Sequence, residues 1–301
     1  MKILVTGTDG FIGGYLKQYF TAAGFNVTGT VYLKSPGRDE YFADITDPRS
    51  LDSLPDAGYD AVVNAAGTVD QSAKTEVMMA VNAAGARNLA QWSHKIGCPH
   101  FIQLSSIAVY GLKTLGTDRR EDSTPRFRGL IGIPYMRSKA LAEKYIEQSG
   151  CHYTMLRLPA VIGKGDSFTS PAIAGAIKNG NFFFTGSGKK MVSLLFAGNL
   201  GPCLDLVIRK GPFNDRFNCC DYHVPWRDIV SEYATALGCP VPVNRKGPLY
   251  FMGRVKDPAA QMFFTFSLFG SHFPSDKLIE ATGFRPPYHW TYAVRESVAG
   301  L

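Results

Sequence analysis

The sequence predicts an α/β fold, with a doubly wound parallel β-sheet followed by a smaller C-terminal lobe. Three observations predict it. Short apolar runs alternate with helix-like stretches in the first half, a glycine-rich turn joins the first such pair, and aromatic residues and prolines become denser in the second half. Strand–helix alternation with short connections is typical of a parallel sheet covered by helices on both faces.

The strand-like runs are short, apolar and bounded by turn residues, as in buried parallel strands. We expect strands at residues 2–6, 27–31, 60–64, 101–105 and 153–158. The stretches between them carry apolar residues at helical spacing, and Gly24 is placed to end the first of them. Helices are therefore expected at residues 11–23, 77–96 and 135–148.

The second half is less regular, so we divide the chain into a sheet domain at 1–165 and a lobe at 166–301. Segments near 190–220 are expected to return to the sheet domain. The lobe should close over the carboxyl edge of the sheet, where open α/β sheets bind ligands. Its aromatic stretch at residues 263–273 would line an apolar pocket, lie on a membrane surface or form core, and we favour core.

The chain has 301 residues, of which 45% are hydrophobic, which is enough for one large domain or a domain plus a lobe. The net charge is +7, but the basic residues are spread out, so we expect an anionic small-molecule ligand and no nucleic acid. No stretch is long enough to span a bilayer and no signal peptide is visible, so a cytoplasmic location is expected. The six cysteines form no C-x-x-C, which favours reduced thiols and no metal.

A glycine triplet lies between the first expected strand and helix, where diphosphate groups are bound. Gly7 permits a tight turn, Gly10 lets the backbone approach the phosphates, and Gly13 lets helix and strand pack closely. This context predicts a Rossmann-type site for NAD or NADP. The expected contacts from this turn and from the end of the second strand are Gly7, Asp9, Gly10, Phe11, Ile12, Gly13, Tyr32 and Lys34.

A dinucleotide site usually has an acid at the end of the second strand, which binds the adenosine ribose hydroxyls. Here the strand ends at Val31 and Tyr32 without an acid, and Lys34 and Arg38 follow. These cations would pair with a 2′-phosphate, which favours NADP over NAD. The alternative is that both belong to an ordinary solvated loop.

Tyr135 and Lys139 are four residues apart and thus share one helix face. A nearby positive charge lowers the pKa of a phenol, which makes it useful for proton transfer to a carbonyl oxygen. A hydroxyl beside the phenol would hold the substrate oxygen, and Ser105 and Ser106 supply candidates at the end of the fourth expected strand.

With these motifs in order, the sequence resembles the extended short-chain dehydrogenase/reductase family, which includes NAD-dependent epimerases and dehydratases. The matching segments cover most of the chain and are tightest over the first 165 residues; they are residues 5–13, 43–47, 64–67, 81–89, 105–111, 135–139, 156–159 and 282–286.

The resemblance implies roles for residues in these segments. Ser106 takes the family's catalytic hydroxyl position, Tyr135 is the acid/base, and Lys139 holds the nicotinamide ribose and tunes Tyr135. The remaining cofactor contacts that it implies are Asp44 and Ile45 at the adenine, Ala65, Ala66 and Gly67 in the cleft, and Pro159 near the nicotinamide.

Three departures narrow the reaction. The dehydratases carry two acids where this chain has Ile107 and Ala108, so dehydration is not expected. The nucleotide-sugar epimerases carry a diphosphate-binding arginine where this chain has Val192, although Lys189 or Lys190 would substitute from upstream. An asparagine at Asn199 looks more like the hydroxysteroid-dehydrogenase and dihydroflavonol-reductase-like branch.

The sequence therefore favours an NAD(P)-dependent oxidoreductase that moves hydride to or from a carbonyl or secondary alcohol of a small molecule. A nucleotide-sugar epimerase is the alternative, and a non-catalytic dinucleotide sensor is a third hypothesis. Relatives often dimerise through the two long helices, so a homodimer through residues 77–96 and 135–148 is expected by resemblance.

Overall fold

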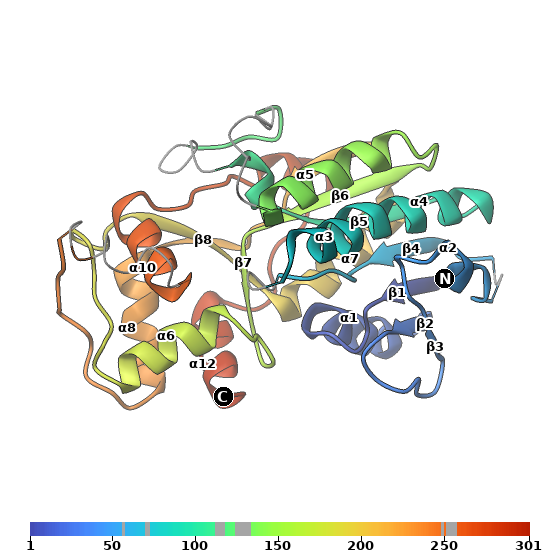
Figure 1. Ribbon diagram of the computed structural model, residues 1–301. Coiled ribbons are helices and arrows are strands. Elements are labelled where there is room, and N and C mark those ends of the chain that lie inside the picture. The colour runs from blue at the N-terminus through green and yellow to red at the C-terminus, as the bar shows by residue number, and fades with distance from the viewer. Residues whose placement is uncertain (56–57, 70–72, 112–117, 124–133, 248–249, 251–257) are drawn as a thin grey trace.

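A computed structural model describes the chain except residues 56–57, 70–72, 112–117, 124–133, 248–249 and 251–257. The described residues form a seven-stranded parallel sheet in the order β3-β2-β1-β4-β5-β6-β9 (Figure 1). The predicted fold class is confirmed. The strands are β1 (Lys2–Thr6), β2 (Asn26–Val31), β3 (Glu40–Phe42), β4 (Ala61–Asn64), β5 (Phe101–Ser106), β6 (Tyr153–Leu158) and β9 (Asp215–Asn218).

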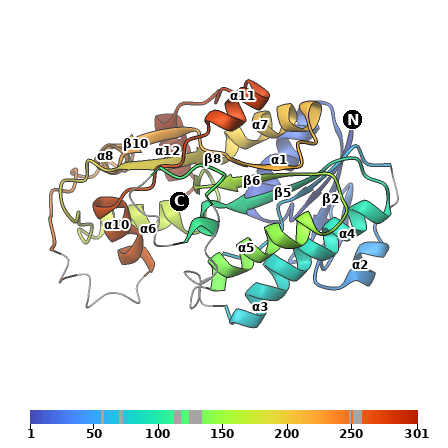
Figure 2. The same cartoon turned by 90° about the horizontal axis from the view of Figure 1, so that it is seen from above.

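Helices cover both faces of this sheet (Figure 2). One face carries α1 (Phe11–Ala22), α7 (Ala197–Lys210) and α11 (Asp276–Thr282). The other carries α2 (Pro48–Asp52), α3 (Thr75–Met79), α4 (Ala86–Lys95) and α5 (Pro134–Glu147). The single helix expected at 77–96 is instead α3, a π-helical segment η1 (Ala80–Gly85) and α4.

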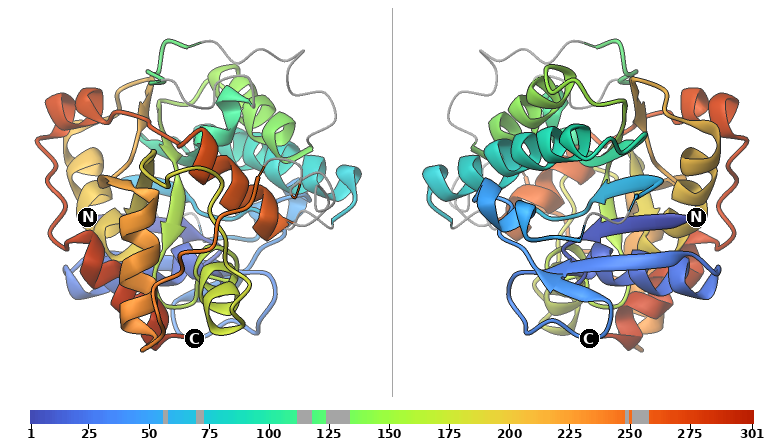
Figure 3. Two further views of the ribbon diagram at one scale, coloured as in Figure 1. Left: turned by 90° about the vertical axis from the view of Figure 1, so that its left-hand side faces the viewer. Right: turned by 90° about the vertical axis from the view of Figure 1, so that its right-hand side faces the viewer.

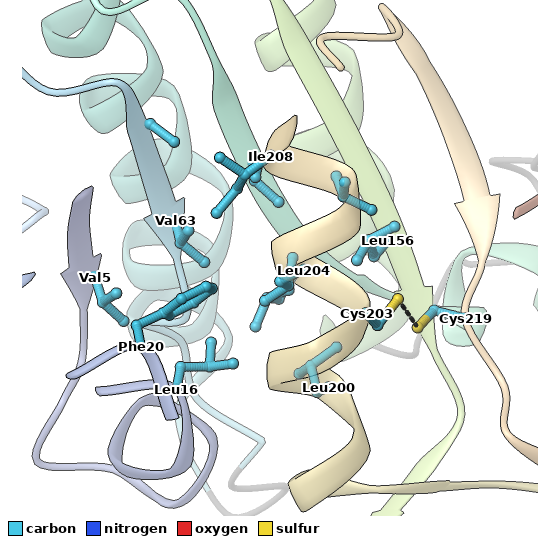
Figure 4. Packing of buried hydrophobic residues seen from close by; sticks show 14 of the residues in the cluster. Val5, Leu16, Phe20, Val63, Leu156, Leu200, Cys203, Leu204, Ile208 and Cys219 are labelled. Atoms are coloured by element: carbon cyan, nitrogen blue, oxygen red, sulfur yellow. Dashed lines mark hydrogen bonds between the residues drawn. The ribbon is translucent and has the colours of Figure 1, made fainter. Parts of the chain in front are cut away.

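The alternation of side chains along each strand divides the core between these faces. Val5 and Val63 pack with Leu16, Phe20 and the apolar side of α7, whose contributions are Leu200, Leu204 and Ile208 (Figure 4). Leu4 and Val62, one residue earlier on each strand, face the opposite helices. In the first cluster the Cys203 and Cys219 sulfurs lie 3.8 Å apart.

A second, three-stranded sheet begins where the first one ends. It has the order β10-β8-β7, with β7 (Ala160–Ile162) starting two residues after β6, β8 (Met191–Phe196) and β10 (Tyr222–Pro225). With α6 (Thr169–Lys178), α8 (Trp226–Ala236), α10 (Pro258–Leu268) and α12 (Trp290–Ala299) it forms a lobe at one end of the molecule (Figure 3, left). Because β6 runs into β7 at its carboxyl end, the lobe lies at the carboxyl edge of the large sheet.

The aromatic stretch 263–273 belongs mainly to the interior. Phe263 packs in the lobe core beside Trp226, and Phe273 stacks on Tyr110 at 5.5 Å, whereas Phe269 is 38% exposed. The core interpretation therefore holds for Phe263 and Phe273. Among the described residues, no helix has the length and apolar content to cross a membrane.

Candidate cofactor and catalytic site

The glycine turn connects β1 to α1 with the geometry that its sequence predicts. Gly7 has φ +68°, a left-handed conformation that side chains disfavour, and a Cβ there would lie 3.0 Å from the Cα of Ala66. A Cβ at Gly13 would collide with the carbonyl oxygen of Gly7. The turn therefore packs against both the end of β4 and its own helix, and only glycine fits at these two positions.

The N-terminus of α1 is open to an anion. Gly10 precedes the helix, so no side chain caps it, and the first i→i−4 hydrogen bond runs from Gly14 N to Gly10 O. The N–H groups of Phe11, Ile12 and Gly13 therefore have no partner within the helix. Free N–H groups and the positive end of a helix dipole fit a diphosphate. The Phe11 ring also contacts Gly163 in the loop after β7, which links the turn to the lobe.

An acid does lie at the carboxyl end of β2, but it comes from the glycine turn. Asp9 Oδ2 accepts hydrogen bonds from Tyr32 N at 2.9 Å and Leu33 N at 2.7 Å. The Tyr32 ring is 57% exposed and stacks on Phe42. Lys34 lies exposed in the loop that follows.

The segment after β4 is the next part of the candidate site. Ala65, Ala66 and Gly67 lie beside the glycine turn, and a Cβ at Gly67 would be 3.1 Å from Asn82 Oδ1 and 3.5 Å from Lys139 Nζ. Asn82, on the π-helical segment, also accepts from Thr68 N at 2.8 Å. The structure thus brings Gly67 and Lys139, which are far apart in sequence, to one place.

The side chains of Ser106 and Tyr135 lie against each other. Ser106 Oγ also accepts from Ala108 N at 3.1 Å, which fixes it at the start of a 3-10 turn (Ile107–Tyr110). Burial raises the pKa of Tyr135, and the contact with Ser106 partly opposes this rise. Burial lowers the pKa of Lys139 to about 8, although the charge of Glu143 opposes the fall.

Ser105, the other candidate hydroxyl, points away from Tyr135. Its Oγ donates to Glu143 Oε1 at 2.6 Å, behind β5. Glu143 also binds Arg157 through two hydrogen bonds of 3.0 and 2.7 Å, and the guanidinium lies 4.7 Å from the centre of the Tyr110 ring. This buried pair joins α5, which carries Tyr135 and Lys139, to β6.

A second buried chain of polar groups crosses the sheet from β1 to β5. Thr6 Oγ1 donates to Asn64 Oδ1 at 2.8 Å, and Asn64 Nδ2 donates to Gln103 Oε1 at 2.8 Å. Gln103 Nε2 and Lys139 Nζ both donate to the carbonyl oxygen of Leu104, at 2.9 and 3.3 Å. The chain therefore connects the residue before the glycine turn with the lysine.

Glu143 and Arg157 were not predicted from the sequence as residues of the site. Glu143 lies four residues after Lys139, and Arg157 interrupts an apolar strand. A charged residue in an otherwise buried strand needs a partner of opposite charge, so Arg157 is the feature of the sequence that could have predicted this ion pair.

The other expected cofactor contacts are Asp44, Ile45 and Pro159. Asp44 Oδ1 accepts from Thr46 N at 2.8 Å in a local turn, and Ile45 is buried beneath η1 against Gly85. Both follow β3 at the carboxyl edge of the sheet. Pro159 is buried between β6 and β7, where the large sheet passes into the lobe.

On the lobe side, Val192 packs in the lobe core, and both Lys189 and Lys190 are exposed. Asn199 is buried and structural: its Nδ2 donates to Asp221 Oδ2 at 2.7 Å and to Tyr288 O at 2.9 Å. The geometry therefore gives Asn199 a clear role in holding the lobe together.

Comparison with known proteins adds to this geometry. The chain is 28% identical over 206 residues to N-acetyl-alpha-D-glucosaminyl-diphospho-ditrans,octacis-undecaprenol 4-epimerase of Escherichia coli O157:H7. That match covers 66% of this chain and 60% of the relative, so the chain spans about three fifths of the relative's length.

Solved structures share the whole fold. The enzyme WbmH of Bordetella bronchiseptica, in complex with NAD+, superposes with a TM-score of 0.82 at 19% identity, covering 99% of this chain and 97% of that one. RMD of Pseudomonas aeruginosa, complexed with NADPH, gives 0.74 at 21% identity, covering 100% and 99%.

The family model of the NAD dependent epimerase/dehydratase family matches residues 3–220, which include the glycine turn, the segment after β4 and the residues Ser106, Tyr135 and Lys139. This match agrees with the resemblance seen in the sequence, and the chain belongs to the NAD dependent epimerase/dehydratase family.

Proposed function

We propose that this protein is an NAD(P)-dependent oxidoreductase that moves hydride to or from a carbonyl or secondary alcohol of a small molecule. The observation that carries the proposal is the contact between the Ser106 and Tyr135 side chains, near the point where Lys139 Nζ approaches Gly67. A phenol that can donate a proton and a hydroxyl that can orient the substrate oxygen are thus close to the glycine-rich dinucleotide site that we propose.

The residues around the cleft fit a bound dinucleotide. Gly7, Gly10 and Gly13 shape the turn, and the free N–H groups of α1 would hold the diphosphate. Asp44 and Ile45 would contact the adenine, and Pro159 would contact the nicotinamide. When bound, the nicotinamide supplies or accepts the hydride.

In the reducing direction, Tyr135 donates its phenolic proton to the substrate oxygen while hydride arrives at the carbon, so a carbonyl becomes an alcohol. The phenolate then takes a proton from solvent. Ser106 donates a hydrogen bond to the same oxygen and orients it. Burial raises the pKa of Tyr135 and the contact with Ser106 opposes that rise. A positive charge on Lys139 would favour the phenolate further.

The test is turnover of a carbonyl panel with NADH and NADPH, followed by absorbance. Tyr135→Phe should lower kcat by roughly 100-fold or more, because positioned proton transfer contributes about 10²–10⁴-fold. Its affinity for the dinucleotide should stay within a few-fold of wild type. Equal turnover by Tyr135→Phe would contradict the proposed role.

A sugar epimerase is the second candidate, and the comparison with the E. coli epimerase favours it. Tyr135 would take the proton of an alcohol as the hydride passes to the bound dinucleotide, and would return the proton when the hydride returns to the other face of the ketone, which leaves the cofactor unchanged. The two candidates differ in an observable way: an epimerase should retain its dinucleotide through purification. Thermal stabilisation by UDP- or TDP-sugars would support this candidate, whereas the burial of Val192, where an arginine would bind diphosphate, favours the first.

We also propose that the sheet domain comprises residues 1–165 and the lobe residues 166–301. From the second half of the chain, β9 joins the large sheet. A homodimer through residues 77–96 and 135–148 remains a prediction, which sedimentation velocity would test.

A further inference from the structure

We propose that Asp9, a residue of the glycine turn, sets the cofactor preference and favours NAD over NADP. The inference rests on the proposed dinucleotide site and names the selectivity of that site. It differs from the preference for NADP that Lys34 and Arg38 suggest in the sequence. The contacts of Asp9 and the charges around it carry the argument.

Asp9 occupies the place that an acid on β2 usually takes. Its Oδ2 accepts from both Tyr32 N and Leu33 N, the first two residues after β2 ends. Within the described part of the chain, Oδ1 accepts no hydrogen bond and Asp9 forms no ion pair. One oxygen therefore anchors the loop, and the other is available to accept from a ribose hydroxyl.

The cations of this region do not neutralise Asp9. Lys17 is paired with Glu40 at 2.7 Å. Arg38 has a side chain that is 95% exposed, and its nearest described acid is Asp39 at 3.7 Å.

Arg38 also lies behind the carboxyl edge. It precedes β3, and β3 begins opposite Gly29, in the middle of β2 (Figure 3, right). Of the two cations that favoured NADP, only Lys34 comes shortly after the end of β2. Its side chain is exposed to solvent without a described partner.

These contacts have opposite consequences for the two cofactors. A ribose 2′-hydroxyl donates a hydrogen bond to a carboxylate, which strengthens binding of NAD. A 2′-phosphate brings a second negative group against that carboxylate. The backbone N–H groups that would otherwise bind this phosphate already donate to Asp9. The site therefore discriminates against NADP by repulsion and because the two backbone donors at the end of β2 are already used.

Equilibrium binding tests the inference on the full chain without any substrate. NADH and NADPH are titrated by fluorescence, and NAD and NADP by calorimetry. We expect wild type to bind the NAD forms at least about tenfold more tightly, which is 1.4 kcal/mol or more. Asp9→Asn should reduce this ratio by at least about tenfold, mainly by tightening NADP, since its amide keeps one acceptor and adds a donor.

Asp39→Asn is the matched control. It removes the same charge from the loop between β2 and β3, away from the end of β2, and Asp39 has φ +57°, a conformation that asparagine tolerates. Its cofactor ratio should equal that of wild type.

Three outcomes would overturn the inference, and they are distinguishable. Equal affinity of wild type for NAD and NADP overturns the selectivity while leaving the proposed function intact. If Asp9→Asn weakens the binding of NAD and of NADP equally, Asp9 only anchors the loop and does not set the preference. If wild type binds neither dinucleotide, the proposed function itself fails.

Discussion

Glu143 lies one helical turn beyond Lys139 on α5, and its carboxylate connects two features of the site. It pairs with Arg157 in the interior and opposes the fall in the Lys139 pKa that burial causes. One residue thus bears on both stability and proton chemistry.

A pH profile tests the second of these effects. With a pKa of about 8, Lys139 loses its charge as pH rises through 8, so activity should fall above that value. Glu143→Gln removes the charge that raises the Lys139 pKa, so the alkaline limb of kcat should move to lower pH. An unchanged limb would contradict the assigned link.

Glu143→Gln should also destabilise the fold by roughly 3–5 kcal/mol, because it leaves the Arg157 charge buried without its partner. Chemical denaturation measures this loss. If the single variant does not fold, the double variant Glu143→Gln with Arg157→Met is measured in its place. The double variant should recover much of the stability while keeping the shifted pH limb.

The choice between Ser105 and Ser106 shows what a sequence motif can decide at this scale. Neighbouring residues of a strand point to opposite sides of the sheet, so only one of the two hydroxyls can face Tyr135. The family motif selected Ser106, and the structure pairs Ser106 with Tyr135 and Ser105 with Glu143. Which side of the sheet each serine faces depends on the pleat of the strand, and two successive serines in a sequence do not reveal it.

At the scale of elements, the β1–α1 unit depends on close approach of turn and helix. Gly13→Ala should disrupt it, because the added Cβ would collide with Gly7 O. We expect dinucleotide affinity to fall at least about tenfold, with a loss of stability of roughly 1–3 kcal/mol typical of overpacking. Thermal unfolding and NADH titration measure the two effects.

Gly175→Ala on α6 is the control for that change. A Cβ at Gly175 meets nothing within 4 Å, so the substitution should be neutral or stabilise by up to about 1 kcal/mol through helix propensity. A Gly13→Ala variant that behaved like Gly175→Ala would show that the close packing is unimportant.

The helix expected at 77–96 illustrates the limit of periodicity. Apolar spacing predicted its span but not the six-residue π-helical segment in its middle. Asn82 on that segment binds Thr68 through both its amide atoms. π-Helical segments are frequent at functional sites, in agreement with the position of Asn82 beside Gly67.

At the scale of the whole molecule, Asp221 lies between the two sheets. It follows β9 of the large sheet, and its N–H and carboxylate bind Leu194 O and Phe196 N on β8 of the small one. Oδ2 also accepts from Asn199, whereas Oδ1 is buried with no partner among the described residues. Burial raises the pKa of Asp221 to about 7.

This raised pKa gives stability a definite pH dependence. The folded chain keeps the proton up to pH 7, whereas the unfolded chain releases it near 3.8. The folded state binds more protons in that window, so stability from this group falls as pH rises through 7. Asp221→Asn keeps an acceptor for Phe196 and Asn199 and removes the charge.

Urea unfolding at pH 5 and pH 8 checks this sign. The Asp221→Asn variant should be more stable than wild type at pH 8 by on the order of 1 kcal/mol, and the advantage should shrink at pH 5. A variant that is less stable than wild type at pH 8 would mean that the carboxylate is needed in its charged form.

The sequence by itself determined the alternation of strands and helices in the first half of the chain, the glycine turn and the candidate residues Ser106, Tyr135 and Lys139. These features depend on local rules: side-chain periods, the conformational freedom of glycine and short motifs. The family membership that these motifs indicated is confirmed over residues 3–220.

The tertiary structure decided the features that join distant residues. It put the Asp9 carboxylate at the end of β2, joined Glu143 to Arg157 and added β9 to the large sheet. An acid missing from β2 in the sequence is thus supplied by the glycine turn. No local pattern encodes such contacts, because they arise only when strands pair and buried charges must find partners.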